Sequence, residues 1–237
     1  DERLTRRGRS LQGPPKIDLP AEGDGTHPRF LLNLRGMLVV FKPSTWEVDG
    51  RVSRLVTNPE IEDGRMGLSS FVKLYFPADT FPLPHWPDFD HGFLHRLDIP
   101  SSGLVLEGVT MEGYWLLRLQ LNIYRVSREY YVTCHETIPH EFDNVKFSIG
   151  SSMVHVGKSI VDEQGRPAET RVKVAAHAVA DTGGLRHYWP DPSLGPLTAT
   201  IIRIRTGRHH QIRTHMLHSG CPTMTDGKYA VWDLYLE

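Results

Sequence analysis

The segment from Leu197 to Gly220, LTATIIRIRTGRHHQIRTHMLHSG, restricts the possible folds of this chain more than any other stretch. Its first ten residues are rich in β-branched and apolar side chains, a composition typical of a strand. A Thr-Gly pair ends that strand, and RHHQIRTHMLHSG is typical of a helix that Gly220 closes as its C-terminal cap. The segment therefore predicts a strand followed directly by a helix.

Other segments predict a mixture of short strands and two or three helices. Strands are expected in MLVVF, GLVLEGVT and SREYYVTCHETI, at residues 37–41, 103–110 and 127–138. Helices are expected in SSFVKLYF and in MEGYWLLRLQLNIY, where apolar residues recur at positions 114, 117, 121 and 124. A β-meander interrupted at 165–167 and at 183–184 is expected from residue 146 to 189. This mixture predicts an α+β fold with a mixed, largely antiparallel central sheet and flanking helices and loops.

The chain is expected to form one domain preceded by an extension. Residues 1–29 are rich in charge, proline and glycine and show no apolar periodicity, so we expect them to be flexible or to lie over the domain. Residues 30–237 are expected to form that domain, since 39% hydrophobic and 23% charged residues are ordinary for a globular protein. A start at Asp1 and an abrupt end in DLYLE favour a fragment with a truncated C-terminal end.

Composition excludes some classes of protein and leaves the compartment open. No apolar run approaches the ~20 residues that a membrane span requires. The two cysteines, Cys134 and Cys221, do not indicate a disulfide scaffold, so an intracellular protein of the cytoplasm, nucleus or an organelle is expected. The formal net charge of -1 gives no overall signal for nucleic acid, which has to come from local clusters instead.

One such cluster lies in the predicted strand and helix. No aspartate or glutamate occurs between Gly195 and Thr225. Basic residues and histidines are frequent there: Arg203, Arg205, Arg208, Arg213, His209, His210, His215 and His218. A surface that contacts phosphates would have this composition. So would a basic helix face balanced by acids elsewhere in the fold, and charge alone does not separate these interpretations.

A second notable segment is HRLDIPSSG, at residues 95–103, which places Asp98 just before a break and Arg96 two residues upstream. In isolation, an aspartate before Ile-Pro is typical of a turn or cap residue. The alternative is a nucleophilic carboxylate at the edge of a cleft, which acts only as an anion. Because burial favours the protonated acid, such an aspartate requires a cation beside it.

Three motifs, taken in order, resemble the RluA-type family of RNA pseudouridine synthases. They are HRLDIPSSGLVL, the REY of residues 128–130, and TGRHHQIRTH followed by GCP and DGKY. VVFKPS and GRPAET are weaker matches, and the resemblance runs from about residue 36 to 230. The ten-residue TGRHHQIRTH is the most specific part. The sequence departs from the family at residues 99–101, where a basic residue and a threonine are usual, and at His209, where a small hydroxyl residue is common.

The resemblance implies a pseudouridine synthase fold and isomerisation of uridine to pseudouridine in RNA, with no cofactor and no metal. It implies that Asp98 is the nucleophile and that Arg213 is its ion-pair partner, with Arg208 as the second choice. Tyr130 is implied to stack on the base and is a candidate for proton transfer.

The same resemblance implies contacts with the flipped nucleotide and the surrounding RNA. Arg96 is implied to fill the gap left by the flipped uridine, and Leu217 lies one turn after Arg213, where it would wall the base pocket. The other residues expected to bind RNA are His95, Arg128, Arg208, His210 and Gln211. The expected partner is ribosomal, transfer or messenger RNA, bound by a monomer without membrane attachment.

Two alternatives to this function stay open. A non-catalytic RNA-binding module would keep the synthase fold and the basic strand–helix surface without forming pseudouridine. A metal-dependent hydrolase would use the histidines of residues 209–218, but no cysteine or carboxylate completes a known ligand spacing there. A pure RNA-binding module has no need for a buried carboxylate, so the combination of Asp98, Tyr130 and Arg213 favours the enzyme.

Overall fold

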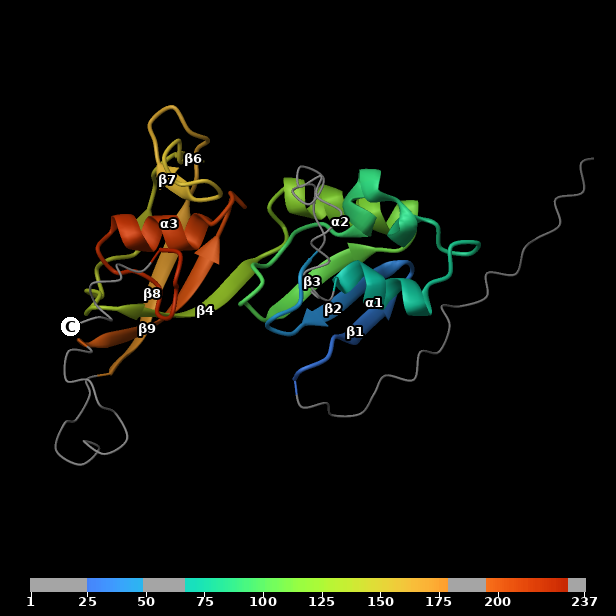
Figure 1. Ribbon diagram of the computed structural model, residues 1–237, viewed down its shortest axis with the longest axis horizontal. Coiled ribbons are helices and arrows are strands. Elements are labelled where there is room, and N and C mark those ends of the chain that lie inside the picture. Colours follow the sequence, from blue (N-terminus) through green and yellow to red (C-terminus); the bar gives the residue numbers. More distant parts are fainter. Residues whose placement is uncertain (1–24, 49–66, 179–194, 230–237) are drawn as a thin grey trace, which may run out of the picture. The chain divides into compact units, whose positions relative to one another are not determined.

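The computed structural model describes residues 25–48, 67–178 and 195–229. The chain divides into two compact units, one within Asp1–Arg125 and one within Val126–Glu237 (Figure 1). The predicted extension lies outside the described residues apart from its last five positions. Among the described helices, none combines the length and the apolar character needed to cross a membrane.

The first unit is built on a three-stranded antiparallel sheet. Its strands occur in the order β1 (Arg29–Leu34), β2 (Met37–Lys42) and β3 (Gly103–Gly108). The two-residue turn between β1 and β2 has positive φ at both Arg35 and Gly36, as a type I′ hairpin requires. A Cβ at Gly36 would lie 2.1 Å from Oγ1 of Thr110, so this close approach also excludes a side chain there.

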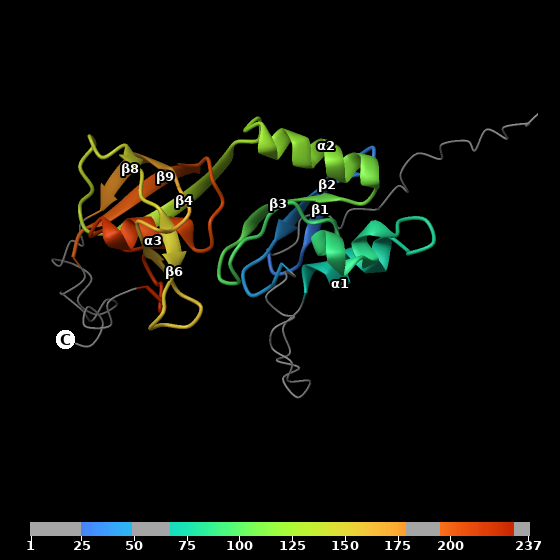
Figure 2. The same cartoon turned by 90° about the horizontal axis from the view of Figure 1, so that it is seen from above.

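Two helices lie on opposite faces of this sheet (Figure 2). On one face, α1 (Leu68–Tyr75) packs its Phe71 ring on Phe30 of β1, with 5.0 Å between ring centroids. On the other, α2 (Met111–Asn122) buries Tyr114 against Leu83 and Leu94. Between α1 and β3 the chain forms two short 3-10 helices, η2 (Leu83–His85) and η3 (Pro87–Gly92).

The apolar stripe predicted for α2 is confirmed at three of its four positions. Tyr114 is buried, and Leu117 and Leu121 pack against the same cluster. Tyr124 was expected to continue the stripe, and this is wrong, because its side chain is 57% exposed. The helix ends at Asn122 and Tyr124 has a left-handed φ of 57°, so the helical periodicity no longer directs its side chain inward.

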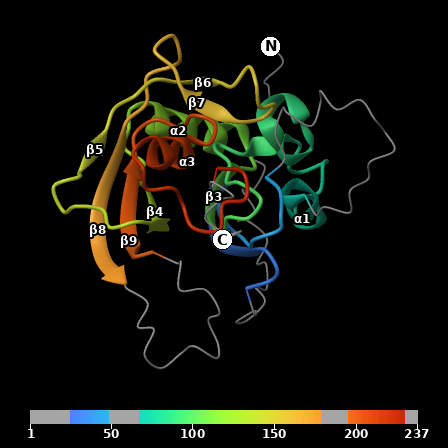
Figure 3. The same cartoon turned by 60° about the vertical axis from the view of Figure 1, so that its left-hand side comes forward.

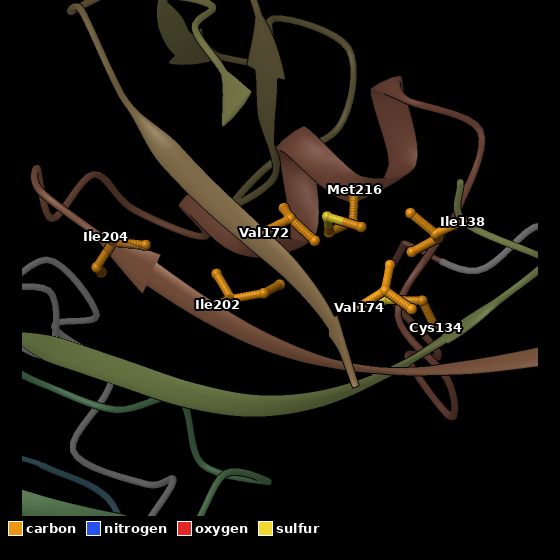
Figure 4. Close-up of a cluster of buried hydrophobic side chains, with 7 residues drawn as sticks. All are labelled: Cys134, Ile138, Val172, Val174, Ile202, Ile204 and Met216. Atoms are coloured by element: carbon orange, nitrogen blue, oxygen red, sulfur yellow. The ribbon is translucent and has the colours of Figure 1, made fainter. Parts of the chain in front are cut away.

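The second unit contains a four-stranded antiparallel sheet with a helix on one face (Figure 3). The strand order is β4 (Arg128–His135), β9 (Leu197–Ile204), β8 (Thr170–Ala178) and β5 (Asn144–Val145). The helix is α3 (Gln211–His218), and a separate ribbon consists of β6 (Ile149–Ser151) and β7 (Ser159–Val161). Figure 4 shows the core between sheet and helix, with Val172 and Ile202 below Met216 of α3.

The strand and helix that open the sequence analysis are confirmed as β9 and α3, with a shift at the helix start. The helix begins at Gln211 rather than at Arg208, because His210 has a left-handed backbone with φ 50°. Its end is as predicted: Gly220 has φ 76°, and backbone bonds from Gly220 to Leu217 and from Cys221 to Met216 form a Schellman cap.

The α+β class with antiparallel sheet and flanking helices is confirmed. Hydrogen bonds divide the described strands among three sheets, and every pairing between named strands is antiparallel. The meander expected at 146–189 is only partly correct among the described residues: β6 and β7 pair with each other, but β8 pairs with β9 and β5 instead of β7. Its predicted break at 183–184 lies outside the described residues.

Candidate active site

Asp98 lies on an irregular loop between η3 and β3 in the first unit. The loop is closed by a bond from the backbone N–H of Ser101 to the carbonyl of Asp98, at 3.0 Å. His95 attaches the loop to β3, since its Nε2 accepts a hydrogen bond from the backbone N–H of Leu106 at 3.2 Å. Asp98 is half-buried and Arg96 is exposed. The loop therefore holds Asp98 and Arg96 at the surface of the first unit, attached to β3 through His95.

Lys42, the last residue of β2, is a buried cation beneath this loop. Its side chain has no exposed surface, and its Nζ donates to the carbonyls of Pro43 and Trp46, each at 2.8 Å. It also donates to the carbonyl of Ile99 at 3.2 Å. Burial lowers the pKa of Lys42 to about 8, although the negative charge of Asp98 acts in the opposite direction. Lys42 thus links β2 to the residue that follows Asp98.

Lys42 was not among the site residues predicted from the sequence. A signal was present, because β2 alternates with Leu38, Val40 and Lys42 on its buried side. A lysine at the third buried position of a strand is rarely left inside without a partner. The Lys-Pro pair of VVFKPS was quoted only as a weak match.

The REY motif lies on β4 in the second unit, where strand alternation separates its residues. Tyr130 is opposite Ile202 of β9 and packs, half-buried, against the core beneath α3. Its neighbour Tyr131 is 88% exposed on the other face of the sheet. Arg128 shares the face of Tyr130, and its Nη2 donates to the carbonyl of Arg205 at 2.8 Å. Alternation along β4 therefore places Arg128 and Tyr130 on one face and Tyr131 on the other.

Arg213 of α3 is bound to the turn that follows the helix. Its Nε donates to Oδ2 of Asp226 at 2.6 Å, and its Nη2 donates to Oδ1 of the same carboxylate. This two-point contact is the strong geometry for an arginine and a carboxylate. The ring of Tyr229 covers the guanidinium, with 4.6 Å from Cζ to the ring centroid. Asp226 therefore fixes the plane of the Arg213 guanidinium, and Tyr229 covers one of its faces.

Asp226 is held as an anion by several donors. It accepts hydrogen bonds from Oγ1 of Thr223 at 2.9 Å and from the backbone N–H groups of Lys228 and Tyr229. Burial acts to raise the pKa of Asp226, but the hydrogen bonds from Arg213 and Thr223 and the charge of Arg213 outweigh it, so the pKa lies below its ordinary value. DGKY was quoted as a match, but Asp226 and Tyr229 were not identified as site residues.

Gln211 joins the β9–α3 turn to β8. Its Nε2 donates to the carbonyl of Glu169 at 2.9 Å and to Oγ1 of Thr170 at 3.0 Å. Its Oε1 accepts from Oγ1 of Thr206 at 2.8 Å and from the backbone N–H of Arg208 at 3.1 Å. Four bonds within the protein use the full capacity of this amide, so Gln211 shapes the turn that carries Arg208.

The other residues of this motif also have protein partners. Nε of Arg208 donates to the carbonyl of Pro167 at 3.0 Å, and Nδ1 of His210 is 2.8 Å from the hydroxyl of Tyr229. Leu217 is half-buried on α3.

The histidines of α3 do not assemble a metal site. His215 has no exposed surface, and its ring nitrogens contact the carbonyl of Phe147 at 3.1 Å and Oγ1 of Thr170 at 2.9 Å. Burial lowers the pKa of His215 below its ordinary value, which favours the neutral ring. Within the described ranges, no group of three or more histidine, cysteine, aspartate or glutamate side chains could hold a metal ion.

The predicted site residues are distributed over both units. Of the predicted residues, His95, Arg96 and Asp98 belong to the first unit, as does Lys42, and the other predicted residues belong to the second. Within each unit, hydrogen bonds hold individual polar groups to neighbouring strands and turns. The pairing of Asp98 with Arg213 and the chemical roles of these residues stay predictions.

The fold is that of pseudouridylate synthase domains. The structure of human RNA pseudouridylate synthase domain containing 1 matches 90% of this chain and 74% of that chain, with a TM-score of 0.60 and 19% identity. Human RNA pseudouridylate synthase domain containing 4 matches 86% of this chain and 69% of that chain, with a TM-score of 0.55 and 18% identity. At this level of identity the likeness concerns the fold alone.

The sequence places the chain in a family. The family model for RNA pseudouridylate synthase matches residues 38–218, so the chain belongs to that family, and to its RluA type. The ribosomal large subunit pseudouridine synthase D of Pseudomonas aeruginosa is 32% identical over 153 residues, which are 62% of this chain and 42% of that protein. The synthase D of Nitrosomonas europaea is 30% identical over 138 residues, 58% of this chain and 35% of that protein. The matched region is about two-fifths of the length of these curated relatives.

Proposed function

We propose that this protein isomerises uridine to pseudouridine in RNA, with Asp98 as the nucleophile. The observation that carries the proposal is that Asp98 lies on a loop fixed by a buried cation, in a chain of the pseudouridylate synthase family. The residue after it, Ile99, accepts a hydrogen bond from Lys42. A carboxylate acts as a nucleophile only as an anion, and a neighbouring positive charge favours that form.

The reaction is an isomerisation, so its atoms balance within the nucleotide. The bond between N1 of uracil and C1′ of the ribose breaks, the base turns, and a bond between C5 and C1′ forms. The hydrogen on C5 is lost as a proton and N1 gains one. Asp98 would attack the sugar or the base to open this sequence, and Tyr130 would stack on the turning base and take part in the proton transfer.

Arg213 would stabilise the Asp98 anion as its ion-pair partner. Its rigid attachment to Asp226 and Tyr229 supports this role, since a fixed guanidinium binds a carboxylate with little loss of entropy. Arg208, the second choice, lies on the turn shaped by Gln211 and has its Nε on a backbone carbonyl.

Access to the base requires that the uridine leave its stack, which costs a few kcal/mol. Arg96 would fill the vacated position, and its exposure next to Asp98 supports this. Leu217 would line the base pocket. The remaining proposed RNA contacts are those of His95, Arg128, Arg208, His210 and Gln211, of which His95 and Gln211 would act mainly by holding the loops that touch RNA.

The proposed substrate is ribosomal RNA of the large subunit, because the similar curated proteins include ribosomal large subunit pseudouridine synthases C and D. Transfer and messenger RNA are the alternatives. The proposed form is a monomer that requires no cofactor or metal.

The test is to incubate total RNA that lacks the modification with the protein and to map new pseudouridines at single-nucleotide resolution. A parallel sample without protein gives the background. We expect one or a few new sites, in large-subunit ribosomal RNA. RNA binding without any new pseudouridine would instead identify a non-catalytic RNA-binding module, and loss of activity on adding a chelator would contradict a metal-free reaction.

A further inference from the structure

The DGKY turn has a defined place in the second unit. After α3 the chain returns to β4, where the backbone N–H of His135 donates to the carbonyl of Pro222 at 2.9 Å, and that of Met224 donates to the carbonyl of Thr133 at 2.8 Å. These bonds bring Asp226 beneath α3, where it meets Arg213. The turn is therefore anchored to the sheet before it contacts the arginine.

Tyr229 is anchored independently of Asp226. Its side chain is only 4% exposed, and its hydroxyl accepts a hydrogen bond from the backbone N–H of Ser159 at 2.6 Å. Nδ1 of His210 lies 2.8 Å from the same hydroxyl, within hydrogen-bond distance. The ring is thus attached to β7 on one side and to the start of α3 on the other.

Together these contacts determine how the guanidinium of Arg213 is oriented. Two of its five N–H groups point at Asp226, which fixes its plane, and the Tyr229 ring covers one face. An unrestrained arginine would lose rotamer entropy on being held in one orientation. Here that loss has already occurred on folding, because Asp226 and Tyr229 hold the guanidinium in one orientation.

We propose that Asp226 and Tyr229 are positioning residues that fix Arg213 for the isomerisation, and that His210 and Ser159 act by orienting Tyr229. This inference rests on the proposed function. The competing explanation is that the same contacts only attach the turn to α3. The two differ in consequence, because displacement of a catalytic group by about 1 Å lowers turnover about 10²-fold without a matching loss of substrate binding.

The first arm of the test observes Arg213 directly and needs no activity. Nε–H signals of arginine are recorded by NMR, and the Arg213 signal is identified from its loss in Arg213→Lys. We expect a signal protected from exchange with water in the wild-type protein and its loss in Asp226→Asn and in Tyr229→Ala. Glu129→Gln, which removes the carboxylate partner of the exposed Arg203, is the matched control and should leave it unchanged.

The second arm measures turnover and KM on an unmodified transcript of large-subunit ribosomal RNA. Asp226→Asn and Tyr229→Ala are expected to lower kcat about 10²-fold and to change KM by less than about twofold. Tyr229→Phe keeps the ring but not the hydroxyl, so a smaller loss is expected. Tyr131→Phe makes the same change on an exposed tyrosine and should keep wild-type kcat.

The outcomes distinguish the positioning role of Asp226 and Tyr229 from the proposed isomerisation of uridine. A protected Arg213 signal that persists in both Asp226→Asn and Tyr229→Ala would overturn the positioning role. Loss of that signal with kcat within twofold of wild type would also overturn it, since the ordered arginine would then not matter to the reaction. Absence of pseudouridine with the wild-type protein would overturn the proposed function, while the NMR arm would still decide whether these residues order Arg213.

Discussion

Lys42 is a buried charge that links the Asp98 loop to the end of β2. Its ammonium group satisfies the carbonyl of Ile99 in the Asp98 loop and two carbonyls at the end of β2. An apolar side chain could fill the same space but would leave these oxygens without a donor, which costs about 1–3 kcal/mol for each buried group. The lysine is therefore a structural link and also a positive neighbour of Asp98.

The lowered pKa of Lys42 predicts a pH dependence of stability. In the unfolded chain the pKa is 10.5, and in the folded protein it is about 8. Between these pH values the unfolded state binds more protons, so the free energy of unfolding contributed by Lys42 rises as the pH increases from 8 to 10.5. The total rise is at most about 3 kcal/mol.

The measurement is urea unfolding at several pH values between 7 and 10.5, followed by tryptophan fluorescence, in wild type and Lys42→Met. The difference between the two proteins isolates Lys42 from other titrating groups, such as Cys134, whose pKa burial raises to about 12. We expect the wild type to gain stability relative to the variant above pH 8. Parallel curves for the two proteins would show that Lys42 does not titrate as described.

At the scale of elements, the β9–α3 connection is held by a side chain rather than by a backbone cap. The N-cap residue of α3, His210, makes no side-chain capping bond, and the turn is closed by the amide of Gln211 instead. The same amide reaches Glu169 and Thr170 at the start of β8. The orientation of Arg208 and of the first turn of α3 thus depends on one buried polar residue.

Gln211→Ala is accordingly expected to destabilise the second unit. The substitution leaves buried donors and acceptors of the turn and of β8 without partners, so the free energy of unfolding should fall by about 2–4 kcal/mol. Urea unfolding followed by circular dichroism measures this. The matched control is Gln164→Ala, at an exposed position, which should change stability by less than about 0.5 kcal/mol. Equal effects of the two substitutions would contradict the bridging role of Gln211.

At the scale of the whole molecule, helices and strands could be predicted from the sequence where neighbouring residues determine them. The β-branched run of β9 and the Gly220 cap of α3 depend on neighbouring residues, and both were located from the sequence. The start of α3 was missed because His210 adopts a left-handed backbone to reach Tyr229, a residue 19 positions away. Helix periodicity does not report a contact of that kind.

The same distinction applies to the candidate site. Asp98, Tyr130 and Arg213 were identified because they lie in motifs that resemble a known family. Lys42, Asp226 and Tyr229 were not assigned roles, because their partners come from other elements: Ile99 lies 57 positions from Lys42, and Arg213 lies 13 positions from Asp226. Alternation along β2 indicates that Lys42 is buried but not which carbonyls it binds, and the burial of Tyr229 follows from tertiary packing that spacing does not reveal.

Asp98 is the residue on which the proposed isomerisation of uridine depends most directly. The most direct test compares wild type, Asp98→Asn and Asp79→Asn, an exposed aspartate after α1, on the same ribosomal transcript. Asp98→Asn is expected to lower single-turnover formation of pseudouridine by at least about 10³-fold while its Kd for RNA stays within about twofold. Asp79→Asn should match wild type in both. Wild-type turnover in Asp98→Asn would contradict the assigned nucleophile.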